Sequence, residues 1–218
     1  MTKNLKIIFI WLSLLGCGQN QSSELRAIIG ENDFEDYPEL DAISTAIGRT
    51  VVGCTVAHLG EGLVMTAGHC VPSNYCRSNS HVVTWGFIAS RPQGVLRSRC
   101  EDVISRNFGP DSDFALLKYD RYPEPYIPVN LDQKPSEGEP LTIFSHPDGE
   151  PLQGSGWCWH LGDYLGKKFK YDCDTLKGSS GAPILNEQFE IVGIHNLGKA
   201  SLGFNAGTYL QDIVEDDE

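Results

Sequence analysis

The stretch Leu63-Val64-Met65-Thr66-Ala67-Gly68-His69-Cys70 carries the strongest single indication of the fold. Its first four residues suit a β-strand, and two small residues and a histidine follow them. The small side chains of Ala67 and Gly68 let other backbone lie close to the histidine. Alone, a histidine beside a cysteine is usually structural, so its role is judged together with the rest of the chain.

Two further patterns follow in chain order. Asp111-Ser112-Asp113-Phe114-Ala115-Leu116-Leu117 places an acid at the start of an apolar strand. Gly178-Ser179-Ser180-Gly181-Ala182-Pro183 places a serine in a glycine-flanked turn. Together with the first stretch they supply what acyl transfer needs: a hydroxyl, a base, an acid that orients the base, and backbone donors for an oxyanion. The candidate catalytic residues are therefore His69, Asp113 and Ser180.

The chain around these patterns is composed of short β-rich segments separated by turns. Clusters of Gly, Pro, Asn and Asp mark the turns, no long stretch has a helical period, and a short helix is expected only at 210–214. An all-β sandwich or barrel is therefore predicted, and the proline-rich segment 122–128 is the best linker between two halves. The expected strands are Thr50–Val52, His81–Trp85, Phe114–Leu117, Leu141–Phe144 and Glu190–Ile194.

The three patterns, in the order His, Asp, Ser, resemble the signatures of the chymotrypsin-like (trypsin-like) serine proteases. The motifs concerned are Thr-Ala-Gly-His-Cys, Asp-x-Ala-Leu-Leu and Gly-x-Ser-Gly-x-Pro, and the resemblance covers roughly Ile28 to Ile213. It implies an all-β fold of two antiparallel six-stranded Greek-key β-barrels with the active site in the cleft between them. The N-terminal barrel would comprise residues 28–125 and the C-terminal barrel residues 126–214.

The resemblance also implies a role for each residue of the site. Ser180 would attack the scissile carbonyl, His69 would move the proton, and Asp113 would orient His69. The backbone N–H groups of Gly178 and Ser180 would form the oxyanion hole. The implied function is a serine endopeptidase that acts on proteins or peptides without a cofactor. The alternative is a non-catalytic binding module on a protease scaffold, which the complete triad disfavours.

Specificity is left open by two conflicting indications. The segment 28–33 resembles the mature start of bacterial glutamyl endopeptidase-like enzymes, in which Thr175 and His195 would bind a substrate glutamate. Asp174, six residues before the serine, stands where trypsin-like enzymes keep the acid that binds Arg or Lys. Protonated His195 with Asp174 facing away favours Glu, and Asp174 facing inward favours Arg or Lys. Because an imidazolium beside Thr175 suits an acidic side chain, cleavage after Glu is the prediction, with Arg or Lys as the alternative. Gly198 is also expected to border the substrate pocket.

One position departs from the trypsin branch. Trypsin-like enzymes carry an aspartate immediately before the nucleophile, and this carboxylate receives the freed N-terminal amine after activation. Here that position is Ser179, which has no carboxylate to hold a buried ammonium. A trypsin-style N-terminal switch is therefore not expected.

The cysteines indicate a disulfide framework. Seven are present, and setting the N-terminal one aside leaves an even number in a chain expected to be exported. Six cysteines allow 15 pairings. The family resemblance implies one pair, which braces the histidine loop. Two others lie in the second half near the expected pocket, and pairing them leaves the last two within the first half. The predicted disulfides are Cys54–Cys70, Cys158–Cys173 and Cys76–Cys100.

The N-terminus is typical of an export signal, predicted over residues 1–16. Two lysines precede the apolar run 7–15, which is about half of the ~20 residues that a transmembrane helix needs. The run ends in Leu14-Leu15-Gly16-Cys17, which resembles the lipobox of bacterial lipoproteins, in which Cys17 would be lipidated. Residues 17–27 would then be a tether or a short pro-segment. The protein is expected to be an exported, membrane-anchored bacterial lipoprotein, periplasmic or at the cell surface, and with an ordinary signal peptide it would be secreted.

The charge balance limits the possible partners. The formal net charge is −12, which argues against nucleic acid as a partner and favours solubility. The acidic tail 215–218 is assigned no function. The remaining histidines lack metal-ligand spacing, so no metal is expected, and the chain is expected to be a monomer. These histidines are His58, His81, His146 and His160.

Overall fold

The structure is a computed structural model of the chain, and it describes residues 26–37, 39, 41–77 and 81–214. The predicted signal peptide, the lipidation site Cys17 and the acidic tail lie outside these residues. Among the helices that the structure describes, none is both long enough and apolar enough to span a membrane.

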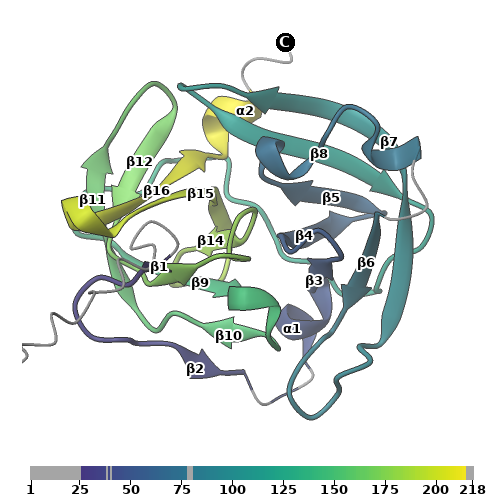
Figure 1. Cartoon of the computed structure of the whole chain (residues 1–218). Helices are drawn as coiled ribbons and strands as arrows, with labels where there is room; N and C mark the ends of the chain where they lie inside the picture. The colour runs from purple at the N-terminus through teal and green to yellow at the C-terminus, as the bar shows by residue number, and fades with distance from the viewer. Residues whose placement is uncertain (1–25, 38, 40, 78–80, 215–218) are drawn as a thin grey trace, which may run out of the picture.

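The first barrel is closed by six antiparallel strands in the order β3-β4-β5-β8-β7-β6 (Figure 1). Its strands alternate between inward and outward side chains, as in β6, where Val83 and Trp85 are fully buried and Val82 and Thr84 are half-buried. The strands are β3 (Ile47–Thr50), β4 (Thr55–Gly60), β5 (Leu63–Thr66), β6 (Val82–Trp85), β7 (Leu96–Phe108) and β8 (Asp113–Tyr119).

The second barrel has the strand order β11-β12-β16-β15-β14-β9, and pairing of β9 with β11 closes it. The fold prediction of two six-stranded antiparallel barrels is therefore confirmed. The short strands β10 (Gln153–Gly154) and β2 (Glu35–Asp36) extend the sheet beyond β9. The barrel strands are β9 (Pro140–Ser145), β11 (Cys158–Asp163), β12 (Lys168–Tyr171), β14 (Pro183–Leu185), β15 (Ile191–Lys199) and β16 (Phe204–Tyr209).

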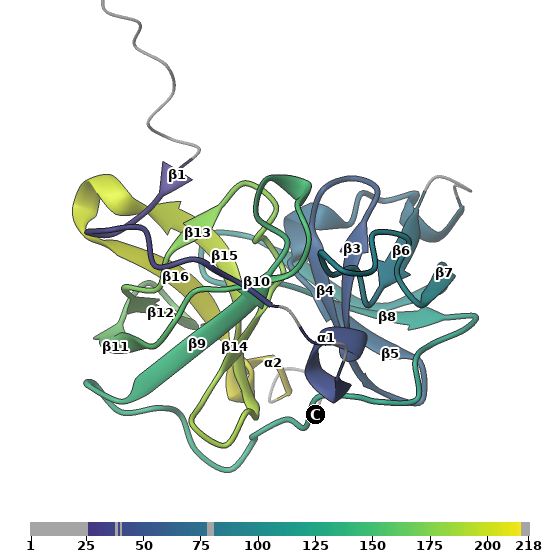
Figure 2. The same cartoon turned by 90° about the horizontal axis from the view of Figure 1, so that it is seen from below.

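The N-terminal segment lies along the second barrel and not in the first (Figure 2). β1 (Arg26–Ala27) pairs with β13 (Thr175–Leu176), and β2 pairs with β10. The helix α1 (Ala42–Ala46) then leads to Ile47, where the first barrel begins. The first barrel therefore begins at Ile47 and not at residue 28, the predicted start. The expected strand Thr50–Val52 is also misplaced, because Val51 and Val52 lie in an exposed turn after β3.

The segment between the barrels crosses near Ile127. The Ile127 N–H donates to His58 O of the first barrel (3.0 Å), and Pro128 O accepts from the Ile191 N–H of the second (2.8 Å). The crossing lies within the predicted linker 122–128. An apolar cluster that includes Met65, Phe114 and Leu210 packs the two barrels together. The remaining short helices are η2 (Gly68–Cys70), η3 (Tyr75–Arg77), η4 (Pro147–Gly149), η5 (Ala200–Leu202) and α2 (Gln211–Val214), the last at the predicted position.

The three predicted disulfides are present. The pair Cys54–Cys70 joins the start of β4 to η2, Cys76–Cys100 joins η3 to β7, and Cys158–Cys173 lies in the second barrel. The first of these lies beside the histidine loop and fixes it against the barrel.

Candidate active site

His69 and Asp113 come from neighbouring parts of the first barrel. His69 lies in η2, directly after β5, and Asp113 is the first residue of β8. The Asp113 carboxylate binds His69 twice: Oδ2 lies 2.7 Å from the ring Nδ1, and Oδ1 accepts the His69 backbone N–H at 2.9 Å. Asp113 is only 4% exposed. A buried carboxylate at Nδ1 places the ring proton there, so that Nε2 is left as the basic nitrogen.

The backbone before His69 requires a glycine. A Cβ atom added at Gly68 would lie 1.8 Å from Asn107 O. The Gly68 carbonyl also accepts a hydrogen bond from Arg106 Nε of β7 (2.8 Å). The motif Ala-Gly-His is therefore explained by close approach of η2 to β7.

Asp113 is also held from the second barrel. Asn196 Nδ2 donates to the Asp113 carbonyl (2.6 Å), and Thr208 Oγ1 accepts the Asp113 N–H (3.2 Å). Thr208 Oγ1 in turn donates to Asn196 Oδ1 (2.7 Å), and both side chains are buried. These bonds join β8 to β15 and β16 at the acid. Sequence reasoning did not identify Asn196 or Thr208, and the only signal was the place of Asn196 beside His195.

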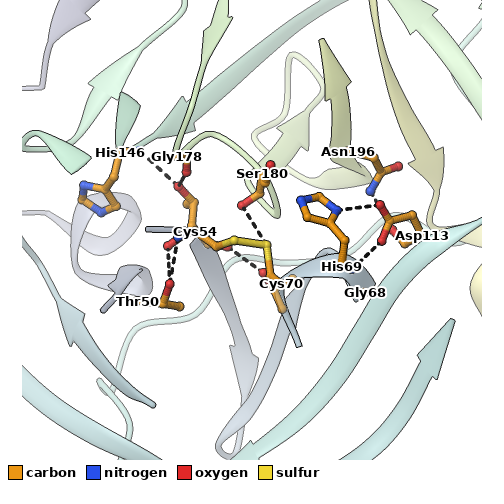
Figure 3. Close-up of a disulfide and its surroundings, with 12 residues drawn as sticks. Thr50, Cys54, Gly68, His69, Cys70, Asp113, His146, Gly178, Ser180 and Asn196 are labelled. Carbon is orange, nitrogen blue, oxygen red and sulfur yellow. Dashed lines mark hydrogen bonds and ion pairs between the residues drawn. A yellow bond between two sulfur atoms is a disulfide. The ribbon is translucent and has the colours of Figure 1, made fainter. Parts of the chain in front are cut away.

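Ser180 lies in the turn between β13 and β14, in the second barrel. Its carbonyl accepts the Thr55 N–H (2.9 Å), and the next residue, Gly181, has φ +84° and would place a Cβ atom 2.1 Å from Thr66 Oγ1. The His69 ring lies between Ser180 and Asp113 (Figure 3). The structure has no hydrogen bond between the Ser180 hydroxyl and His69. Such bonds are often long in free enzymes and tighten when substrate binds.

The backbone N–H groups of Gly178 and Ser180 have no acceptor among the described residues. Gly178 has φ +101°, and a Cβ atom there would lie 2.3 Å from His146 O, so that only glycine fits. Two unpaired N–H groups beside the serine are the donors that an oxyanion requires.

A cavity of about 290 Å³ brings most of the predicted site residues together. His69 and Ser180 line it, and so do Thr175, His195 and Gly198. Ala27 of the N-terminal segment also lines this cavity, because β1 pairs with β13. The pairing of residues so far apart in the chain could not be read from the sequence.

Asp174, which was expected to border the substrate pocket, does not line this cavity. Its carboxylate accepts the backbone N–H groups of Ile29 and Asp33, each at 2.8 Å. The residue is 2% exposed. Burial raises the pKa of Asp174, and the hydrogen bonds from Asp33 and Ile29 offset part of that effect. Asp174 therefore fastens the N-terminal segment to the second barrel.

His195 is buried and neutral. Its Nδ1 makes a short hydrogen bond with the hydroxyl of Tyr171. Burial and, to a smaller extent, the nearby His69 lower the pKa of His195, Asp113 acts in the opposite direction, and the resulting pKa is about 3. Without a bound carboxylate, His195 is therefore not the imidazolium on which the Glu prediction depended.

Cys54, His69 and Cys70 each offer one atom of a kind that can bind a metal, and these three atoms lie within 4.8 Å of one another. The two sulfur atoms are bonded to each other, so neither is the thiolate that a metal ligand has to be. This cluster therefore does not form a metal site.

Comparison with known proteins places this geometry in a family. Residues 52–194 match the model of the trypsin-like peptidase domain. The chain belongs to the trypsin-like peptidases. This peptidase is similar to the glutamyl endopeptidase of Staphylococcus epidermidis, with 29% identity over 93 residues, or 41% of this chain and 31% of that enzyme. It is similar to the glutamyl endopeptidase of Staphylococcus aureus strain NCTC 8325, with 30% identity over 78 residues, or 34% of this chain and 22% of that enzyme. The matches thus span about a third or less of these relatives' length.

Solved structures agree on the fold of the peptidase. A Glu endopeptidase in complex with MPD superposes with a TM-score of 0.72 at 21% identity, over 87% of this chain and 96% of that one. The VesB protease of Vibrio cholerae superposes with a TM-score of 0.65 at 17% identity, over 85% of this chain and 66% of that one. At these identities the likeness concerns the fold alone.

Proposed function

We propose that the protein is a serine endopeptidase that hydrolyses peptide bonds through an acyl-enzyme. The observation that carries this proposal is the buried Asp113 carboxylate, 2.7 Å from His69 Nδ1, with Ser180 across the ring in the same cavity. Ser180 Oγ attacks the scissile carbonyl carbon while His69 Nε2 takes the hydroxyl proton. His69 then gives this proton to the leaving amine, and the C–N bond breaks. Water, deprotonated by His69, attacks the ester, and the product acid leaves with Ser180 restored.

The N–H groups of Gly178 and Ser180 supply the oxyanion hole in this proposal. Each tetrahedral intermediate carries a negative oxygen, and the two unpaired backbone N–H groups at Gly178 and Ser180 can donate hydrogen bonds to it. Removal of one such donor typically costs about 3 kcal/mol in the transition state.

The experiment for this function is the Ser180→Ala variant. Peptide hydrolysis should be lost, because no nucleophile remains, while the thermal unfolding midpoint stays close to that of the wild type. Hydrolysis at the wild-type rate by the folded variant would remove Ser180 from the mechanism.

Cleavage after glutamate is the specificity that the cavity favours. Thr175 and His195 line it, Asp174 does not, and the two staphylococcal proteins named above are glutamyl endopeptidases. A substrate carboxylate that enters the cavity needs donors, because burying it unpaired is costly. The Thr175 hydroxyl is one donor. In this proposal the Tyr171 hydroxyl donates to His195 Nδ1, so that neutral His195 carries its proton on Nε2 and offers a second donor. Paired peptides that differ only in Glu or Arg before the cut test this choice, and cleavage after Arg alone would contradict it.

Export and lipid anchoring at Cys17 complete the proposal. Arg26, where the described structure begins, is nine residues after Cys17. An extended chain of that length spans at most about 30 Å, so an anchor at Cys17 would hold the cavity near a membrane surface. Globomycin should block processing of the precursor, and Cys17→Ser should release the protein into the soluble fraction. A mature N-terminus well beyond Cys17 would indicate a freely secreted protein.

A further inference from the structure

We propose that Thr55, a residue of the first barrel, is a positioning residue that holds the oxyanion hole of the second barrel in its active shape. This inference rests on the proposed function, because it concerns the N–H groups of Gly178 and Ser180. The sequence patterns do not single out Thr55, which follows Cys54 at the start of β4.

Thr55 contacts the nucleophile turn, residues 176–182, at two points. Its Oγ1 donates to the Gly178 carbonyl (2.8 Å), and its backbone N–H donates to the Ser180 carbonyl (2.9 Å). The residue is fully buried, so water does not compete for these bonds. A single residue of the first barrel thus holds the carbonyls of both residues whose N–H groups would bind the oxyanion.

The same hydroxyl also joins the turn to the loop 146–149. Thr55 Oγ1 accepts the His146 N–H (3.1 Å) while it donates to Gly178 O. In this loop, the Asp148 N–H donates to the Lys177 carbonyl (2.5 Å). That carbonyl belongs to the peptide that carries the Gly178 N–H. Because C=O and N–H point in opposite directions in a trans peptide, holding this carbonyl on the loop turns the Gly178 N–H away from it.

Without the hydroxyl, Gly178 would be poorly constrained. Glycine has the widest range of backbone conformations, and here it adopts φ +101°. In Figure 3, Gly178 and His146 lie on the side of Ser180 away from His69, so the turn is held there from the side opposite the base. Loss of the Thr55 hydroxyl would leave two buried partners, Gly178 O and His146 N–H, unpaired. Both lie on the backbone that directs the oxyanion donor.

Neutral hydrogen bonds hold the nucleophile turn here, where trypsin-like enzymes use an aspartate paired with the freed N-terminal amine. Ser179, where trypsin-like enzymes keep an aspartate, bonds through Oγ to Ser145 Oγ (2.9 Å) and accepts the Leu176 N–H (3.2 Å). In the described part of the chain, no residue of the turn 176–182 takes part in an ion pair. The contact between the barrels at Thr55 therefore holds the nucleophile turn in place, as the freed terminal ammonium does in the trypsin branch.

The test compares Thr55→Val, which keeps the shape and removes the hydroxyl, with Thr55→Ser, which keeps the hydroxyl. For Thr55→Val we expect kcat to fall about tenfold to a hundredfold, since a misplaced oxyanion donor loses part of the 10²–10³ that a donor contributes. KM should change by less than about twofold, because the ground-state contacts remain. Affinity for a peptide boronate, which forms a tetrahedral adduct on Ser180, should fall by the same factor as kcat. Thr55→Ser should recover most of the loss.

The matched control is Ser98→Ala. Ser98 is a buried hydroxyl of the first barrel that accepts Trp85 Nε1–H (2.8 Å), in the interior of that barrel. Loss of the Ser98 hydroxyl leaves the buried Trp85 Nε1–H unpaired, so Ser98→Ala should lower the unfolding midpoint and leave kcat unchanged. The inference is overturned if Thr55→Val lowers kcat no more than Ser98→Ala, if only KM changes, or if Thr55→Ser restores nothing. Absence of hydrolysis by the wild type would instead overturn the proposed function, and this inference with it.

Discussion

At the scale of single residues, we expect substitution of His195 to change substrate specificity and substitution of Asp174 to leave it unchanged. His195 lines the cavity as a neutral ring, and a bound Glu carboxylate would be expected to raise its pKa by direct attraction. His195→Ala should therefore lower kcat/KM for Glu peptides about tenfold to a hundredfold, the loss expected for a hydrogen bond to a charged group. Cleavage of the paired Arg peptide serves as the control, and an equal loss on both peptides would speak against a specific role.

Asp174→Asn should alter stability and leave specificity in place. The asparagine keeps one acceptor but turns an N–H group towards Ile29 N or Asp33 N, which are also donors. We expect a lower unfolding midpoint and faster amide exchange at Ile29 and Asp33, with an unchanged ratio of Glu to Arg cleavage. Selective loss of Arg cleavage would return Asp174 to the pocket and support trypsin-like specificity.

These two residues also show the limit of what can be predicted from a single sequence. The triad residues were predictable because each stands in a local motif whose residue types fit a single chemistry. The direction of the Asp174 side chain was not, since its partners lie more than 140 residues away along the chain. The neutral state of His195 follows from burial beside Tyr171, which no local pattern records.

At the scale of elements, strands with clear alternation were predicted and segments held by distant partners were not. β6, β8, β9 and β15 lie where apolar alternation or an apolar run indicated strands. β1 and β2 have two residues each and form by pairing with β13 and β10, strands that are distant in the sequence. Because these two strands pair outside the first barrel, that barrel begins at Ile47 and not at the predicted residue 28. Thr55 was missed for the same reason, because its role lies entirely in contacts with the other barrel.

At the scale of the whole molecule, buried neutral histidines predict a pH-dependent stability. Burial lowers the pKa values of His58, His146, His160 and His195, to about 4 for His146 and about 3 for His195. The unfolded chain binds these protons near pH 6.5 and the folded chain does so only at lower pH, so stability is lost as the pH falls below about 6.5. The free energy of unfolding should therefore decrease from pH 7 to pH 5, and His146→Gln should flatten this slope. A flat profile for the wild type would contradict the buried neutral state.

The account depends most on one claim about the whole molecule, that two barrels bring a base and a nucleophile together in one cavity. The most direct measurement is labelling by a peptide phosphonate, followed by mass spectrometry that distinguishes Ser180 from Ser179. We predict a single adduct, on Ser180, absent from Ser180→Ala and slowed by several orders of magnitude in His69→Ala. A wild type that hydrolyses peptides without forming this adduct, or an adduct on another serine that abolishes activity, would contradict the claim.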